Sequence, residues 1–342
     1  PCRNLWRLTV VVAAVLALGS GCVSVDLARL LNPTLEEVTL RQPRGLTRQR
    51  VLVVDISGAI TTAPGTPFSP GRRCTPDAVR AVLDQAEHDG RVKAVLLRID
   101  SPGGGVTATD MIAHEILAFR QATGIPVHAM IMAAGCSGGY YIATSAERIW
   151  AHPAAVTGSI GVIAVFPQVQ GLTGKLGLDA VVIKSGDLKD MGSPLRDMKP
   201  DERALLQGMI DEYYGLFLDR IAAARPRLPS RAAVRPVADG RVFTASQALQ
   251  AGLVDGVGYM DDAIAGLLAA AGLRDARVVT YAYGPNDNAT LYSPASAAPM
   301  PPAAINLRLL DLPPLAVEAG FHYLWLPGQA GGAPGLDLQA DM

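Results

Sequence analysis

Short apolar runs alternate with longer amphipathic stretches through the middle of the chain. The runs are rich in β-branched residues and end at Gly, Pro, Ser or Asp, which is typical of buried strands. They cover residues 51–56, 92–99, 126–132, 181–183 and 278–281. Between them, apolar residues recur at helical spacing and predict helices over residues 76–89, 107–121, 138–146, 200–224, 246–251 and 261–271. Strands that alternate with helices predict an α/β fold with a mostly parallel sheet.

The start of the chain has the pattern of an export signal. Arg3 and Arg7 precede an apolar run from Leu8 to Leu18, and small residues then lead to Cys22. Three interpretations of residues 1–25 stay open: a cleaved signal peptide, a lipoprotein signal whose Cys22 is lipidated, or a membrane anchor. We expect the membrane to be a partner of the chain, through lipidation or through an anchor.

The other boundaries follow from changes in composition. Residues 26–49 carry prolines and arginines without periodicity and predict a tether, residues 50–283 form the folded domain, and residues 284–342 form a Pro/Ala/Gly-rich tail. Within this tail, residues 321–326 are too apolar for a free linker. We expect them to dock on the domain, on a neighbouring subunit or on the membrane.

Charge and motif content argue against several functions. The chain has 30 Lys and Arg against 31 Asp and Glu, so no basic field favours nucleic acid. The four cysteines lack a CxxC pair, and His114-Glu115 is followed by Ala118 where a zinc peptidase needs a second His. Gly174-Lys175 is followed by Leu176, so a phosphate-binding Walker A motif is not formed. We therefore expect neither a metal site nor a cofactor.

Two glycine-rich turns carry the candidate chemistry, because each follows a predicted strand. The first holds Gly103 and Gly104 within DSPGGG, and the second holds Ser137 and Gly138 within GCSGGYY. Glycines let backbone amides face a cleft, which an oxyanion hole requires. Ser137, at a strand-to-helix turn, is the candidate nucleophile; Gly103 or Gly104 and Gly138 are the candidate donors.

A serine nucleophile needs a base, and the segment IKSGDLKD at 183–190 offers Lys184 and Lys189. An ordinary lysine has a pKa near 10.4, and desolvation lowers it by several units. A desolvated Lys189 would deprotonate Ser137. The alternative is that both lysines are solvated loop charges, and the histidines have ordinary surface or core explanations.

Five motifs in order resemble the signal peptide peptidase A family: DSPGGG at 100–105, SGGYYIA at 137–143, TGSIGV at 157–162, IKSGDLKD at 183–190 and DGRVFTASQALQAGLVDGVG at 239–258. The resemblance implies that Ser137 is the acylated nucleophile, that Lys189 is the base and that Ser159 orients the lysine. It also implies a ClpP- or crotonase-like ββα superhelix and a ring-shaped homo-oligomer in which neighbouring chains supply Ser and Lys.

The predicted function is that of a membrane-associated serine endopeptidase of the bacterial cell envelope, with its catalytic domain outside the cytoplasm. Its substrates would be apolar peptides such as signal peptide remnants. Two alternatives stay open: an acyl-CoA enzyme on a crotonase-like scaffold, and a catalytically silent oligomeric scaffold. Cys136, where relatives mostly have Ala, is a further nucleophile candidate, but no histidine neighbours it in a recognisable motif.

Overall fold

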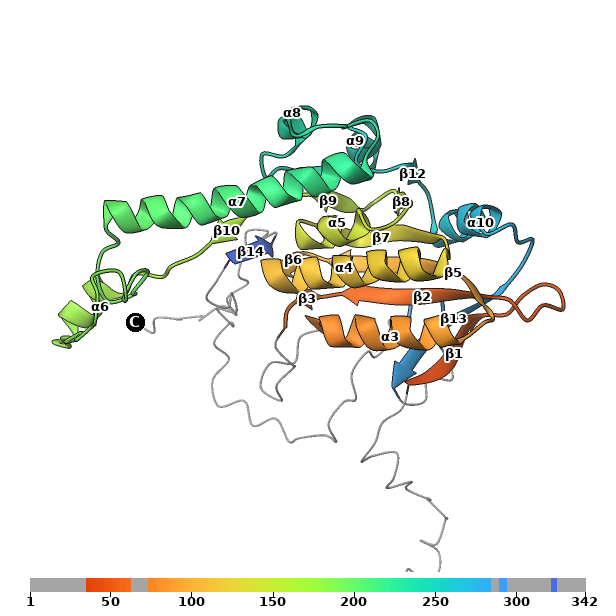
Figure 1. The fold of residues 1–342 in the computed structure, drawn as a ribbon, viewed down its shortest axis with the longest axis horizontal. Coiled ribbons are helices and arrows are strands. Elements are labelled where there is room, and N and C mark those ends of the chain that lie inside the picture. Colours follow the sequence, from red (N-terminus) through yellow and green to blue (C-terminus); the bar gives the residue numbers. More distant parts are fainter. Residues whose placement is uncertain (1–34, 63–72, 284–288, 294–320, 325–342) are drawn as a thin grey trace, which may run out of the picture. The chain divides into compact units, whose positions relative to one another are not determined.

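The computed structural model describes residues 35–62, 73–283, 289–293 and 321–324 (Figure 1). From Glu36 onward these residues belong to one folding unit. The export-type start, including Cys22, lies outside the described residues. No helix in the described ranges has the length and apolar content needed to cross a bilayer.

The main sheet is mostly parallel, which confirms the predicted α/β class. Its strands lie in the order β1 (Leu35–Arg41), β13 (Arg277–Tyr283), β2 (Arg50–Ser57), β5 (Val92–Ser101), β7 (Val127–Cys136), β8 (Arg148–Ala151) and β12 (Gly256–Val257). Every pair from β13 to β12 is parallel. Two short strands branch off: β9 (Val156–Gly158) pairs parallel with β7, and β11 (Val242–Thr244) pairs antiparallel with β9.

Helices cover both faces of this sheet. Along its strands, the side chains that point to one face and those that point to the other are both buried. Met130 and Leu96 share a cluster with Ile264 and Leu267 of helix α10 (Met260–Ala270), whereas the alternate residues Val95 and Leu97 are fully buried on the other face. That other face contacts α3 (Pro76–His88) and α5 (Gly138–Ala143), with α4 (Val106–Thr123) packed between them. The remaining helices are α6 (Gln170–Lys175), α7 (Pro200–Ala224), α8 (Arg231–Val234), the 3-10 turn η1 (Arg235–Val237) and α9 (Ala245–Gln250).

A second, smaller sheet includes a piece of the C-terminal tail. Its order is β10 (Ile163–Ala164), β14 (Phe321–Leu324), β6 (Gly103–Gly105), β3 (Ala59–Ile60) and β4 (Arg73–Cys74). Residues 321–324 therefore dock on the domain, which confirms the first of the three expectations for them. Trp325 and Leu326 lie outside the described residues.

Two segments differ from the sequence prediction. Val181–Ile183 is wrong as a strand: the residues have no regular structure, and Val181 and Ile183 are 88% and 94% exposed. The physical reason is that no strand of the described part of the chain lies alongside them to pair with. Conversely, β1 falls inside the predicted tether, and its Val38 and Leu40 are buried in the core.

Candidate active site

Ser137 occupies a strained turn between β7 and α5. Its φ is 51°, in the left-handed region that residues other than glycine seldom adopt. The turn is held by the Ser137 amide, which donates to the Gly158 carbonyl at 2.7 Å, and by the Tyr141 amide, which donates to the Ser137 carbonyl at 2.9 Å. Strain maintained by surrounding structure is characteristic of functional positions.

The Ser137 hydroxyl is buried without a hydrogen-bond partner among the described residues. The residue is 1% exposed. Most buried hydroxyls in proteins are hydrogen-bonded, so an unpartnered one calls for an explanation. It also means that no base of the same chain lies within hydrogen-bonding reach of this oxygen in the described part.

Ser159 lies beside Ser137 through strand register. Strands β7 and β9 are parallel with Cys136 opposite Gly158, so the two serines are the next residues on adjacent strands. Ser159 has a φ of 49°, is buried, and its amide donates to the Arg241 carbonyl at 2.7 Å. Among the described residues, these two serines are the only ones other than glycine with a positive φ. Strand register thus places Ser159 next to the candidate nucleophile.

The three candidate oxyanion glycines meet at this point, but their amides are not equivalent. A Cβ built on Gly103 would lie 2.8 Å from the Gly138 nitrogen, so the two turns touch. The Gly103 amide donates to Ser101 Oγ at 3.1 Å, and that hydroxyl donates to the Gly58 carbonyl at 2.6 Å. Because its amide is occupied, Gly103 serves as the close-packed turn, and Gly104 and Gly138 remain as candidate donors.

An aromatic cluster next to this turn was not predicted as part of the site. Tyr141, one helical turn after Ser137, packs edge-on against Phe217 of α7 with ring centroids 5.1 Å apart. The Tyr141 hydroxyl donates to Asp110 at 2.7 Å, and the Arg220 guanidinium lies 5.6 Å from the ring. The sequence signal was available, because the GCSGGYY motif places Tyr141 on the helix that Ser137 begins.

Lys189 lies on a different part of the molecule. It belongs to residues 165–199 between β10 and α7, which we call the arm; its helix α6 lies at the left of Figure 1, well separated from α5. The Lys189 side chain is exposed and makes no hydrogen bond or ion pair with described residues. The next residue, Asp190, is held by two ion pairs: its carboxylate accepts hydrogen bonds from Lys184 at 2.6 Å and from Arg196 at 2.8 Å. Hydrogen bonds from Arg196 and then Lys184 lower the pKa of Asp190.

The arm also exposes many apolar side chains. They are Val165, Leu172, Leu176, Leu178, Val181, Val182, Ile183, Leu188 and Leu195. Exposed apolar side chains concentrated in one segment are typical of an interaction site. Within one chain, the structure therefore brings Ser137, Ser159, Gly104 and Gly138 together and leaves Lys189 apart from them.

The competing groups do not provide a base or an alternative nucleophile. His128 is buried at the opposite end of β7, about 30 Å along the strand from Ser137 at roughly 3.3 Å per residue. Burial lowers the pKa of His128 and raises that of Cys136 to about 12, so both are uncharged at neutral pH. Cys74 and Cys136 are free thiols. Among the described residues, no group of three His, Cys, Asp or Glu could hold a metal ion.

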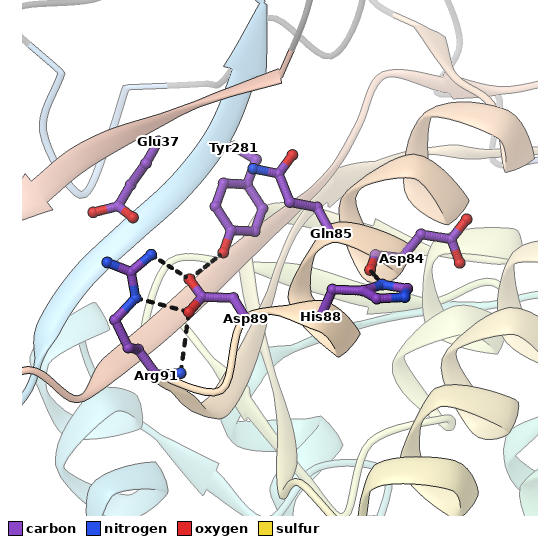
Figure 2. A pocket seen from close by; sticks show the side chains of 7 residues that line it. All are labelled: Glu37, Asp84, Gln85, His88, Asp89, Arg91 and Tyr281. Atoms are coloured by element: carbon purple, nitrogen blue, oxygen red, sulfur yellow. Dashed lines mark hydrogen bonds and ion pairs between the residues drawn. The ribbon is translucent and has the colours of Figure 1, made fainter.

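A separate hollow, lined by Glu37, Asp84, Gln85, His88, Asp89, Arg91 and Tyr281, is shown in Figure 2. At its centre Asp89 accepts from Arg91 at 2.8 Å and from the Tyr281 hydroxyl at 3.0 Å. Burial raises the pKa of Asp89, but its hydrogen bonds outweigh burial and hold that pKa well below its usual range. Its carboxylates are all in ion pairs, Asp89 with Arg91 and Arg50, Glu37 with Arg50, and Asp84 with Arg80, so we interpret this hollow as a structural ion-pair site.

A parallel α/β core, with a strained serine between a strand and a helix and two glycine turns beside it, defines an α/β serine peptidase of the ClpP-like type. Residues 119–274 match the model of peptidase family S49. The putative signal peptide peptidase SppA of Enterococcus faecium is 32% identical over 247 residues, which cover 72% of this chain and 70% of that protein. The chain belongs to peptidase family S49, the signal peptide peptidase A family of serine peptidases.

Two further relatives differ in length. A putative protease of Synechocystis sp. is 37% identical over 217 residues, 64% of this chain and 73% of that protein. Protease 4 of Salmonella typhi is 35% identical over 215 residues, 63% of this chain but only 34% of that protein. The chain thus spans about a third of the length of protease 4.

Proposed function

We propose that this chain is a membrane-associated serine endopeptidase in which Ser137 is the nucleophile and Lys189 of a neighbouring copy is the general base. Its substrates are extended apolar peptides such as remnant signal peptides. The observation that carries the proposal is the unpartnered, buried Ser137 hydroxyl on a strained turn beside the amides of Gly104 and Gly138.

The base is assigned to a neighbouring copy because of where the two residues lie. The Ser137 hydroxyl has no hydrogen-bond partner among the described residues, while Lys189 is exposed on an arm that carries many exposed apolar side chains. If that arm packs over the Ser137 turn of the next copy, the amine loses water, and desolvation favours its uncharged form. A homo-oligomer is therefore part of the proposal, and heterologous contacts of this kind form a ring when the rotation between copies closes.

In the proposed reaction, the uncharged amine takes the proton from Ser137 Oγ, and the oxygen attacks the peptide carbonyl carbon. The amides of Gly104 and Gly138 stabilise the oxyanion. Lys189 returns the proton to the leaving amine as the C–N bond breaks, and water then releases the acyl group by the same steps. Ser159 acts as a positioning residue that hydrogen-bonds the amine.

The substrate class and location rest on the relatives' names and on the start of the chain. The Enterococcus relative is named as a signal peptide peptidase, and residues 1–25 have an export pattern. A catalytic domain held next to the membrane outside the cytoplasm would encounter membrane-embedded apolar peptides. Attachment through Cys22 or through an anchor is part of this proposal.

Labelling with a fluorophosphonate tests the nucleophile directly. The wild-type protein should incorporate one label at Ser137 and hydrolyse an apolar peptide, and Ser137→Ala should lose both properties while keeping its circular dichroism spectrum. A crotonase-like acyl-CoA enzyme or a silent scaffold would not be labelled at Ser137. That result, with the fold intact, would refute the proposal.

A further inference from the structure

Thr109 of α4 carries a second buried hydroxyl without a hydrogen-bond partner, and this hydroxyl lies against the Ser137 turn. Thr109 is 0% exposed, and its Oγ1, like Ser137 Oγ, has no partner among the described residues. A Cβ added to Gly138 would lie only 2.7 Å from Thr109 Oγ1, so this hydroxyl packs directly on the residue that follows the nucleophile. Two unpartnered hydroxyls therefore adjoin Gly138, one in sequence and one in space.

The other buried threonines whose hydrogen bonds are known are satisfied within the fold. The hydroxyls of Thr144, Thr157 and Thr280 donate to backbone carbonyls at 2.5, 2.6 and 2.9 Å. A buried hydroxyl that lacks such an acceptor destabilises the folded protein. Departures from this rule are typical of functional positions, where a ligand supplies the missing partner. Thr109 is such a departure, and it occurs at the candidate site.

Helix α4 brings Thr109 to the site near the positive end of the helix dipole. The helix begins at Val106, directly after Gly104 and Gly105, and Thr109 is its fourth residue. Within the described part of the chain, no side chain caps this end, and the first turn holds no acidic residue. The first amides of a helix have no partner inside it and favour negative charge. The surroundings of the Thr109 hydroxyl therefore suit a developing anion.

We propose that Thr109 is a further oxyanion donor, whose hydroxyl hydrogen-bonds the negative oxygen of the tetrahedral intermediate beside the amides of Gly104 and Gly138. This inference rests on the proposed function. Charge develops on that oxygen when Ser137 Oγ adds to the peptide carbonyl carbon, and the Thr109 hydroxyl keeps its proton throughout. An interaction that strengthens as this charge develops raises kcat and leaves KM little changed.

The first test compares Thr109→Val, which keeps the volume but removes the hydroxyl, with Thr109→Ser, which retains the hydroxyl. Thr109→Val should lower kcat for an apolar peptide about 10²-fold with KM little changed, and Thr109→Ser should keep most of the activity. Thr107→Val is the matched control, since Thr107 is an exposed threonine two residues earlier in α4. It should turn over as the wild type does.

A peptide aldehyde measures the interaction separately from turnover. It adds to Ser137 Oγ and forms a tetrahedral adduct whose oxygen takes the place of the oxyanion. Its inhibition constant should rise at least about tenfold in Thr109→Val and stay unchanged in Thr107→Val.

Thermal unfolding distinguishes this role from a structural one. Because the hydroxyl has no partner in the described fold, Thr109→Val should unfold at the same temperature as the wild type or higher. Thr280→Val removes a buried hydroxyl that donates to the Val53 carbonyl, so it should unfold at a lower temperature with kcat unchanged. A lower unfolding temperature in Thr109→Val would show that its hydroxyl stabilises the fold, and would overturn the inference.

The outcomes separate the two claims. If Ser137 is labelled and peptides are cut, but Thr109→Val turns over or binds the aldehyde as the wild type does, the inference about Thr109 is wrong and the proposed function stands. If Ser137 is neither labelled nor needed for hydrolysis, both are overturned.

Discussion

The Ser137 turn and the Lys189 arm are opposites in structural terms. The turn is buried, carries positive φ at Ser137 and Ser159, and is fixed by backbone hydrogen bonds to neighbouring strands. The arm is exposed, mostly without regular structure, and apolar on its surface. The Ser137 turn is fixed by contacts within the chain, whereas the arm has the properties of a surface that binds a partner.

The difference indicates a division of labour within the site. The sheet holds the nucleophile and the oxyanion donors in position, because parallel strands and glycine turns fix their atoms within narrow limits. In the proposed function, the amine would instead be delivered by a surface that only assembly buries. Activity would then depend on contact between subunits.

Replacing the amine should have the largest effect. We expect Lys189→Ala to lower kcat by about 10³-fold or more, because among the described residues no other base lies within reach of the serine hydroxyl. Lys175→Ala, which removes another exposed lysine of the arm, should leave kcat unchanged. The kcat of peptide hydrolysis under matched conditions checks both variants. Equal activity in Lys189→Ala and Lys175→Ala would contradict the role of Lys189 as the base.

Charging the arm should disrupt the proposed assembly. The double substitution Val181→Asp with Ile183→Asp would bury two unpaired carboxylates at the contact, so we expect dissociation and a loss of activity of about 10²-fold. Light scattering coupled to size exclusion measures the assembly. Leu46→Asp is the control, since Leu46 is fully exposed on a different loop; an unchanged mass for the arm variant would assign the apolar patch to another role.

Ser159 should have a smaller, positioning effect. We expect Ser159→Ala to lower kcat about tenfold and to shift the pH dependence of kcat, with KM little changed. Ser159→Gly removes the same hydroxyl but tolerates the positive φ, so it separates chemistry from backbone strain. Wild-type turnover in the glycine variant would show that only the backbone of Ser159 matters.

Scaffold ion pairs should affect stability and not turnover. Arg225 donates to both Asp255 oxygens at 2.8 Å and is buried, although the Asp255 side chain is 32% exposed. We expect Arg225→Ala to lower the free energy of unfolding by about 2 kcal/mol, and Arg231→Ala, which breaks an exposed pair with Asp219, by less than about 0.5 kcal/mol. Urea titration measures the free energy of unfolding of both variants. Equal losses in the two variants would contradict the expectation that the buried pair stabilises the fold more than the exposed pair.

The strand and helix pattern of the domain was predictable where elements are long. Helical periodicity located α4, and a continuous apolar run located β7 over residues 126–132, although the strand itself ends at Cys136. Strands such as β9 and β11, three residues each, are too short to carry a period. They matter nonetheless, since the pairing of β9 with β7 is what brings Ser159 beside Ser137.

The candidate site was predictable as residue types and not as an arrangement. The glycine turns identified Ser137 and Gly138, but only the structure shows that the Gly103 amide is occupied by Ser101. The apolar run at 181–183 predicts a strand, because a short apolar run is the same sequence signal whether its side chains are buried or exposed, as they are here. Composition indicated that residues 321–326 dock, yet no local signal encodes pairing with residues 220 positions away.

The shared site is tested most directly by producing Ser137→Ala and Lys189→Ala chains together in equal amounts, each being inactive alone. If every site combines Ser137 of one chain with Lys189 of the next, half of the sites receive an intact serine and half of those an intact lysine, so about one quarter of wild-type activity should return. A mixture as inactive as its components, in assemblies shown by mass to contain both chains, would contradict the account.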